Sequence, residues 1–262
     1  MSDQLGNWLD QTRHLIGPQV VKVAGYDVAV ELTYPMLARA FLPVLGRLND
    51  HGPGRIIAGL AGIPGGGKST FAAVLQKIAD LVLPGQLATV GIDGWHYPNA
   101  VLDARTTRDP QGNLIPLRQR KGGPESYDID AMLADLQRLR EARTAVSLPA
   151  YDRTLHEPVA DALTVGPDVR IVLFEGNYVL GGVAGVPAWD QVAAVLAPRM
   201  YLVADRAAAE QQTIARHIRG GLTPEQARDK YDRNDRLNTD LIEATAGRAD
   251  LTISLDPPSL WP

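Results

Sequence analysis

The sequence predicts an α/β fold built around a mostly parallel sheet, and three observations point to it. Residues 55–61 form a short apolar, β-prone run that is followed by a glycine-rich turn. An amphipathic helical pattern over 71–79 comes directly after that turn. Residues 171–174 are four consecutive apolar side chains, which is typical of a strand buried on both faces of a parallel sheet.

The glycine-rich turn, residues 62–70, reads GIPGGGKST and fits the pattern GxxxxGK[ST]. Its glycines allow the backbone to curl until successive N–H groups face inward and can hold phosphate oxygens. The following helix adds its free amides and the positive end of its dipole. We therefore expect a nucleoside triphosphate, with Lys68 at the β- and γ-phosphates and the Ser69 hydroxyl on Mg²⁺. The expected nucleotide-binding residues are Gly62, Gly65, Gly66, Gly67, Lys68, Ser69 and Thr70.

The alternative for this turn is a link between a strand and a helix that binds no ligand. It is disfavoured because every position that the pattern requires is filled, with a strand predicted before it and a helix after it.

The composition narrows the class of protein. A length of 262 residues suits one large α/β domain, or a core domain with an appendage. A net charge of −4 argues against a nucleic-acid-binding surface, and the absence of cysteine excludes disulfides, thiolate zinc sites and cysteine nucleophiles. The chain starts with no basic region followed by an apolar run, and no segment approaches 18 uncharged apolar residues. We expect a cytoplasmic protein with neither nucleic-acid nor membrane partners.

Residues 1–54 are expected to form a small N-terminal extension ahead of a main domain over 55–262. Residues 20–23 and 26–32 predict a hairpin that turns at 24–25, and 34–48 has helical periodicity that Pro43 bends or breaks. We interpret this segment as a structural cover for one face of the sheet or as a contact in a homodimer, and we expect no site in it.

Acidic residues follow two of the predicted strands. Residues 86–92 read as a parallel strand that ends at Asp93, and Glu175 follows the apolar run 171–174. Ligands bind beyond the carboxyl ends of strands in open α/β sheets, so both carboxylates are placed for chemistry. Asp93 could act as a general base on a substrate hydroxyl, hold Mg²⁺ through water, or cap a turn. Glu175 is expected to hold Mg²⁺ or its waters, whereas His96 is interpreted as a packing residue.

Two loop segments lie between these strands. Residues 103–124 are rich in charge, and their basic cluster could neutralise phosphates or an acidic substrate, or could be a solvated surface. Residues 129–140 predict a packing helix capped by Asp128 or Ser126, and 146–149 a short strand. The loop 151–156 then places a tyrosine, an aspartate and a histidine where they can bind a polar hydroxylated ligand.

The last third predicts a helical lid over about 206–247. A strand at 200–204 precedes a helix at 207–218, which two glycines end, and Thr223 and Pro224 begin the next helix. Arginines on two hinged helices suggest a lid that closes over the triphosphate, and the alternative is a pair of solvated surface helices. Residues 249–255 read as a final strand, after which 256–258 end the fold.

Five motifs together resemble the P-loop kinase superfamily that includes uridine kinase, phosphoribulokinase, bacterial type I pantothenate kinase and kinases associated with fructose transport. The resemblance covers about residues 55–255 and implies a P-loop NTPase three-layer sandwich. The motifs are the turn at 62–70; DGWH at 93–96, like DGFH or DGFY; PESYD at 124–128, like PESFD; EGNY at 175–178; and residues within 221–238 that are similar to GL…EEA…NDxPN.

The resemblance implies roles for individual residues. Asp93 corresponds to the catalytic base, Glu175 to the metal-linked carboxylate and Arg216 to a lid arginine. Tyr151, Asp152 and His156 match the YDxxxH segment with which uridine kinases hold a nucleoside. Gln212 stands where the fructose-transport kinases often have an arginine, so either Arg219 takes its place or the lid contributes less charge. The substrate-binding residues implied are Asp93, His96, Tyr151, His156, Tyr178 and Asn234, and the catalytic ones are Asp93, Lys68 and Arg216.

The function expected from these features is an ATP- and Mg²⁺-dependent kinase that phosphorylates a hydroxyl of a small metabolite such as a sugar, a nucleoside or a pantothenate-like acid. The alternative is a regulatory NTPase that hydrolyses nucleotide and binds a protein partner, because the form GIPGGGKST also occurs in chaperone-like GTPases. Those proteins read guanine with [NT]KxD, and this sequence contains no such tetrapeptide.

Overall fold

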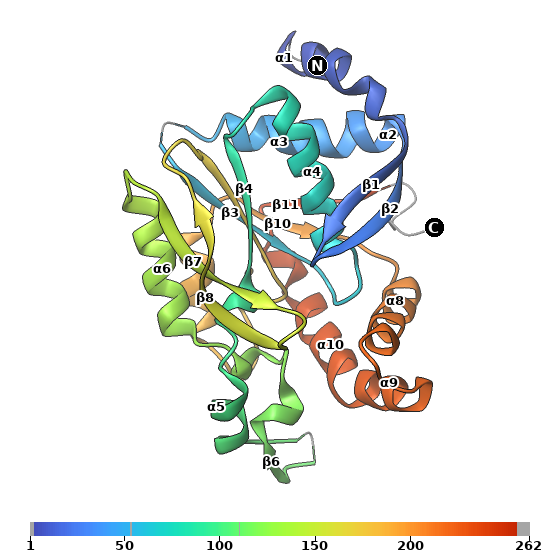
Figure 1. Cartoon of the computed structure of the whole chain (residues 1–262), viewed down its shortest axis with the longest axis vertical. Helices are drawn as coiled ribbons and strands as arrows, with labels where there is room; N and C mark the ends of the chain where they lie inside the picture. The colour runs from blue at the N-terminus through green and yellow to red at the C-terminus, as the bar shows by residue number, and fades with distance from the viewer. Residues whose placement is uncertain (1–2, 53, 110, 256–262) are drawn as a thin grey trace.

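The computed structural model describes residues 3–52, 54–109 and 111–255, and its centre is a sheet of five strands (Figure 1). The strand order is β11–β10–β3–β9–β4, and every neighbouring pair is parallel. All five carboxyl ends therefore lie at one edge of the sheet. The strands are β3 (Ile56–Ala61), β4 (Leu87–Gly91), β9 (Ile171–Glu175), β10 (Arg199–Leu202) and β11 (Leu251–Ile253).

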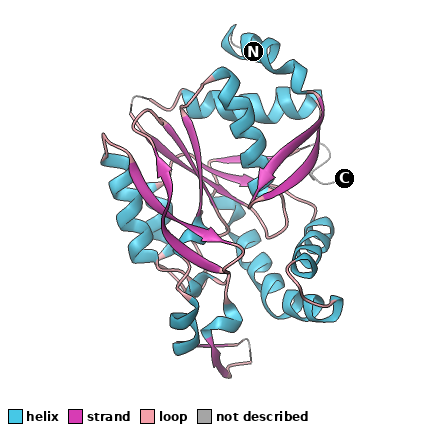
Figure 2. Cartoon of the chain, in the orientation of Figure 1, coloured by secondary structure: helices cyan, strands magenta, loops and turns pink. Residues whose placement is uncertain are grey.

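Two hydrophobic cores cover the two faces of this sheet. Alternate residues of a strand point to opposite faces, so Leu60 of β3 joins one core and Ala61 joins the other. The first core includes α4 (Lys68–Val82), and the second includes α6 (Ile129–Glu141) and α7 (Trp189–Val195). Figure 2 shows helices on both sides of the strands. This three-layer α/β arrangement confirms the predicted fold class.

The N-terminal segment adds a helix, a hairpin and a second helical stretch to the first core. The hairpin pairs β1 (Gly17–Val23) with β2 (Tyr26–Leu32), with Val23 opposite Tyr26. The turn residues Ala24 and Gly25 have φ of +51° and +87°, as the tight turns favoured in hairpins require. The predicted hairpin is therefore present, and β1 begins earlier than predicted. It follows α1 (Asp3–Thr12) and η1 (Arg13–Leu15).

Pro43 does not break the helical stretch that follows the hairpin. The stretch runs through α2 (Tyr34–Met36), the π-helical turn η2 (Leu37–Phe41) and α3 (Leu42–Asn49). The Leu42 N–H bonds to the carbonyl of Leu37, five residues back, and this wide turn lies immediately before the proline. Phe41 stacks on Phe71 of α4 with ring centroids 4.6 Å apart, so the segment packs directly on the helix after the glycine-rich turn.

The second half of the molecule contains a hairpin that the sequence analysis missed. Strand β7 (Val146–Asp152) pairs with β8 (Glu157–Val165), so Tyr151 and Asp152 lie in a strand, and the predicted loop 151–156 is corrected to the hairpin's tip. Most of β8 is exposed or half-buried, and its apolar pattern was therefore weak. Before it lie α5 (Asn99–Ala104), β5 (Thr106–Arg108), β6 (Leu114–Pro116), η3 (Ile92–Trp95), η4 (Leu117–Arg120) and η5 (Pro124–Ser126).

The expected lid is a succession of helices after β10. Asp205 caps α8 (Arg206–Arg219), and Thr223 forms a capping box with Gln226 at the start of α9 (Pro224–Lys230). A π-helical turn η6 (Tyr231–Asp235), α10 (Arg236–Thr245) and η7 (Ala246–Arg248) complete it. The predicted end of the fold at 256–258 lies outside the described residues.

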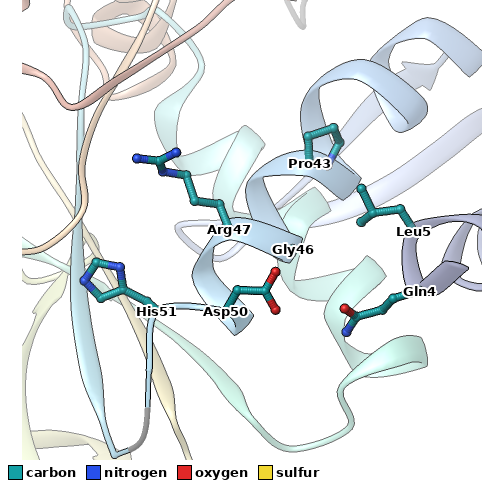
Figure 3. Close-up of a pocket in the computed structure, with 7 residues that line it drawn as sticks. All are labelled: Gln4, Leu5, Pro43, Gly46, Arg47, Asp50 and His51. Carbon is teal, nitrogen blue, oxygen red and sulfur yellow. The ribbon is translucent and has the colours of Figure 1, made fainter. Parts of the chain in front are cut away.

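A surface hollow of about 460 Å³ lies between α1 and α3 (Figure 3). Its lining residues are Gln4, Leu5, Pro43, Gly46, Arg47, Asp50 and His51. None of the residues expected in a functional site is among them. In the part of the chain that the structure describes, no helix has both the length and the apolar character needed to span a membrane.

Candidate active site

The glycine-rich turn connects β3 to α4 and is packed against α8 of the expected lid. Gly65 has φ of +72°, and a Cβ placed there would lie 2.1 Å from the carbonyl oxygen of Ala209 in α8. Gly67, the residue before α4, has φ of +87°. Both the backbone conformation and the close approach of α8 therefore require glycine at position 65.

Lys68 lies folded back into this turn. Its side chain is buried, and its ammonium group donates to the carbonyl oxygens of Gly62 at 2.8 Å and Ile63 at 3.0 Å. Burial lowers the pKa of Lys68 to about 8, although the carboxylates of Glu175 and Asp93 raise it. The charged amine thus lies where a phosphate oxygen of a bound nucleotide would replace those carbonyls as its partner.

Ser69 and Glu175 meet at the carboxyl ends of the strands. The Ser69 hydroxyl, in the first turn of α4, donates to Oε1 of Glu175 at 2.8 Å. Burial, with a contribution from Asp93, raises the pKa of Glu175, and Lys68 and Ser69 oppose that shift. A hollow of about 580 Å³ between β1 and α4 opens beside this pair.

This donor set fits a nucleoside triphosphate with Mg²⁺. A serine hydroxyl and one carboxylate are what such a site contributes, because Mg²⁺ keeps waters and phosphate oxygens as its other ligands. The Thr70 hydroxyl is buried without a partner among the described residues, so a polar group remains for a ligand at the start of α4. Lys68, Ser69 and Glu175 would hold the nucleotide and its metal here.

Asp93 follows β4 and lies in the short 3₁₀ helix η3. Its carboxylate accepts from Arg153 at 2.9 Å and lies 3.5 Å from the hydroxyl of Tyr127. Burial raises the pKa of Asp93, but His96 and the positive charges of Arg153, Arg216 and Lys68 together lower it below its usual value. Asp93 is therefore an ionised carboxylate, half-exposed at the sheet edge that also bears Glu175.

His96 contacts the backbone of Asp93. The ring is buried and packs on Tyr127 with centroids 4.0 Å apart, and Nδ1 lies 3.0 Å from the backbone carbonyl of Asp93. Nδ1 therefore bears the proton and donates to that carbonyl. Burial lowers the pKa of His96, which favours the neutral ring. His96 thus packs against Tyr127 next to Asp93, and its expected role in substrate binding stays a prediction.

Two residues expected to bind substrate have their polar groups committed elsewhere. Tyr178 is fully buried, and its hydroxyl donates to the carbonyl of Gly122 at 2.8 Å. Asn234 is also buried; its Oδ1 accepts from Arg120 and its Nδ2 donates to the carbonyl of Lys121 at 2.9 Å. Both side chains hold the segment around Gly122 in place, and their expected roles in substrate binding stay predictions.

The other expected residues lie nearer the open side. Tyr151 is half-buried, with its ring centroid 5.6 Å from that of His96, and can contact a ligand next to Asp93. His156 is an exposed residue of the hairpin tip with φ of +54°, and its backbone carbonyl accepts from Lys121. Arg216 is an exposed residue of α8, and its charge lowers the pKa of both Asp93 and Lys68.

The structure adds cationic residues that the sequence analysis did not assign. Arg153 pairs with Asp93, and the Lys121 ammonium lies 5.0 Å from the ring centroid of Tyr151. Arg120 is buried, bonded to Glu125 and to two asparagines of the lid. The basic cluster over 103–124 was the available signal for Lys121 and Arg120. Arg153 had none, because its pairing with Asp93 crosses 60 positions of the chain.

A phosphate-binding turn on a parallel sheet, with a hydroxyl–carboxylate pair and a second carboxylate beside it, defines a P-loop NTPase of the kinase type. No protein-family model matches the chain. A putative uridine kinase of Schizosaccharomyces pombe is 31% identical over 204 residues, which are 76% of this chain and 83% of that protein. A pantothenate kinase of a Bradyrhizobium strain is 35% identical over 155 residues, 59% of this chain and 43% of that protein.

Among solved structures, a putative fructose transport system kinase from a Silicibacter strain matches with a TM-score of 0.68 and 32% identity. The match covers 81% of this chain and 96% of that one. The chain belongs to the P-loop kinase superfamily of these uridine kinase-like, pantothenate kinase and fructose-transport kinase proteins.

Proposed function

We propose that this protein is an ATP-dependent kinase that transfers the γ-phosphoryl group of ATP to a hydroxyl group of a small metabolite. The observation that carries the proposal is the placement of Asp93 beside the nucleotide site. Asp93 and Glu175 both raise the pKa of Lys68, and Asp93 also raises the pKa of Glu175, so the three groups lie close together. One carboxylate at this edge can serve a metal and the other an attacking hydroxyl.

The acceptor oxygen would attack the γ-phosphorus while the bond to the bridging oxygen of ADP breaks, and Asp93 would take the hydroxyl proton. Bound Mg²⁺ would neutralise charge on the phosphates. Lys68 would leave the carbonyls of Gly62 and Ile63 for the phosphate oxygens, and Arg216 would stabilise the charge of the transferring group. Closure of α8–α10 would exclude water, which otherwise competes as the acceptor.

A regulatory NTPase is the second candidate, since the phosphate-binding turn alone serves both classes. The half-exposed carboxylate of Asp93, which pairs with Arg153 of the β7–β8 tip, favours the kinase. A hydrolytic switch has no need of a second carboxylate that can act as a base on an acceptor hydroxyl.

The test is ADP formation by the purified protein with Mg·ATP and a panel of sugars, nucleosides, sugar acids and pantothenate. We expect turnover that requires an acceptor, and a loss of about 10²- to 10⁴-fold in Asp93→Asn. Asp168→Asn, an exposed carboxylate between β8 and β9, is the matched control. Acceptor-independent hydrolysis that Asp93→Asn leaves intact would instead support the switch.

A further inference from the structure

The tip of the β7–β8 hairpin is held in one conformation over Asp93. The Asp152 carboxylate accepts from the backbone N–H groups of Thr154 at 2.7 Å and Leu155 at 2.9 Å. The Lys121 ammonium donates to the carbonyl of His156 at 2.8 Å, and the Asn99 side-chain amide donates to the same oxygen at 3.1 Å. Four bonds therefore fix the short turn from which Arg153 projects.

Arg153 has most of its hydrogen-bonding capacity free. A guanidinium group has five N–H donors, and Arg153 makes one hydrogen bond within the described part of the chain, to Asp93 at 2.9 Å. Both side chains of this pair are partly exposed, 39% for Arg153 and 40% for Asp93. Such an exposed ion pair contributes little net free energy, so an incoming anion can replace one partner.

A second cation, Lys121, lies near Arg153. Arg153 and Lys121 lie on the ring of Tyr151, 5.6 Å and 5.0 Å from its centroid. The nearby acids are already committed: Asp152 to the turn amides, and Glu157 to the backbone N–H of Asn99 at 2.9 Å. The Lys121 ammonium itself bonds to two uncharged oxygens, those of Asn99 and His156. Within the described residues, the pair with Asp93 is therefore the one ion pair that either cation makes with a carboxylate.

The ion pair between Asp93 and Arg153 competes with the role of Asp93 as a base for the acceptor hydroxyl. The ion pair stabilises the ionised carboxylate and so reduces its tendency to take a proton. An acceptor that brings its own anionic group can bond to Arg153 and release Asp93 for the hydroxyl. A neutral acceptor offers no such exchange.

We propose that Arg153 is a specificity-determining residue, and that the acceptor is a hydroxyl compound with an anionic oxygen group, a carboxylate or a phosphate, which binds between Arg153 and Lys121. This inference rests on the proposed kinase function. It commits to hydroxy acids, sugar acids or sugar phosphates, and it excludes neutral sugars and nucleosides as good acceptors.

The test compares acceptors in pairs that differ in the anionic group: D-glycerate with glycerol, gluconate with sorbitol, pantothenate with pantothenol, and ribose 5-phosphate with ribose. ADP formation with Mg·ATP is measured for wild type, Arg153→Gln, Arg153→Lys and Arg13→Gln. Arg13 is an exposed arginine of the N-terminal segment paired with Asp10, and its substitution removes the same charge far from Asp93.

We expect wild type to prefer the charged member of at least one pair by 100-fold or more in kcat/KM. Arg153→Gln should raise KM for that acceptor by about 10- to 100-fold, the value of a hydrogen bond to a charged group, while the neutral member changes little. Arg153→Lys should recover part of the loss, and Arg13→Gln should match wild type. Whether acids or phosphates are preferred identifies the anionic group.

Binding is measured separately, by titration calorimetry of each charged compound in the presence of a non-hydrolysable ATP analogue. Turnover confined to neutral acceptors, an unchanged charged-to-neutral ratio in Arg153→Gln, or binding of none of the charged compounds would overturn this inference. The first two results would leave the kinase intact. Acceptor-independent hydrolysis that survives Asp93→Asn would overturn the kinase itself, so the two failures are distinguishable.

Discussion

The phosphate-binding turn and the hairpin over Asp93 lie at the same edge of the sheet but are held by different forces. The turn is surrounded by buried apolar residues of β3, α4 and β9, and a close backbone contact with α8 leaves no room at Gly65. The hairpin tip is held by exposed or half-buried hydrogen bonds, two of them local bonds to Asp152 and the others between partners 35 to 58 positions apart. Apolar burial makes the phosphate-binding turn, the donor side of the site, rigid. The hairpin tip, on the acceptor side, can exchange its polar partners for those of a ligand.

The largest expected effect distinguishes the two arginines that could complete the lid. Arg216→Gln should lower kcat by about 10³-fold, because an arginine on the transferring phosphoryl group is worth at least that much. The affinity for ATP should change little. Arg219→Gln, on the same helix, is the matched comparison and should retain most of the activity. Steady-state kinetics of both variants decide this, and the reverse order would assign the role to Arg219.

The rigidity of the donor side can be tested at two glycines. Gly65→Ala should weaken ATP binding by at least about 100-fold, because positive φ strains alanine and its Cβ would overlap the carbonyl of Ala209. Gly85→Ala has nearly the same φ, +71°, but nothing within 4 Å of its Cβ. It therefore reports the cost of the backbone conformation alone. Equal losses of nucleotide affinity in the two variants would show that the contact with α8 does not matter.

The buried hydrogen bonds between η6 and the segment around Lys121 can be tested at Asn234. Asn234→Ala removes an acceptor from buried Arg120 and a donor from the carbonyl of Lys121, and should cost about 1–3 kcal/mol in the free energy of unfolding. Hydrogen exchange should show that the opening concentrates in 117–123 and η6. Asn113→Ala, whose contacts with Asp109 are exposed, is the control. Uniform loss of protection across the central sheet would contradict a local role.

The smallest effect is a pH dependence of nucleotide binding. Lys68 has a pKa of about 8, so its amine is mostly protonated and charged below pH 8 and loses that charge above it. The contribution of Lys68 to ATP affinity should therefore be constant below pH 8. Above pH 8 the affinity should fall by up to about tenfold per pH unit. Bound phosphate raises the pKa of Lys68 in the complex, so the decline begins at the pKa of the free protein and ends at the higher pKa of the complex. Titrations of an ATP analogue should show this decline in wild type but not in Lys68→Arg.

Much of the donor site could be predicted because its residues are neighbours in the chain. The turn, Lys68 and Ser69 lie within nine positions, and the five strands had clear apolar patterns. Glu175 and Asp93 could be predicted as well, because parallel strands bring their carboxyl ends to one edge of the sheet. Strand β8 was missed because few of its side chains are buried. Of the two effects expected of Pro43, a break is absent, and a π-helical turn precedes the proline.

The sequence by itself determined the class of fold, the phosphate-binding turn and the two carboxylates, since local pattern and the geometry of parallel sheets suffice for these. Tertiary structure alone decided that Tyr178 and Asn234 point inward and that Arg153 reaches Asp93. The reason is physical: a tyrosine, an asparagine or an arginine can bond to any polar group that folding brings within 3 Å. Which group that is depends on segments 56 to 113 positions away, and no local pattern encodes them.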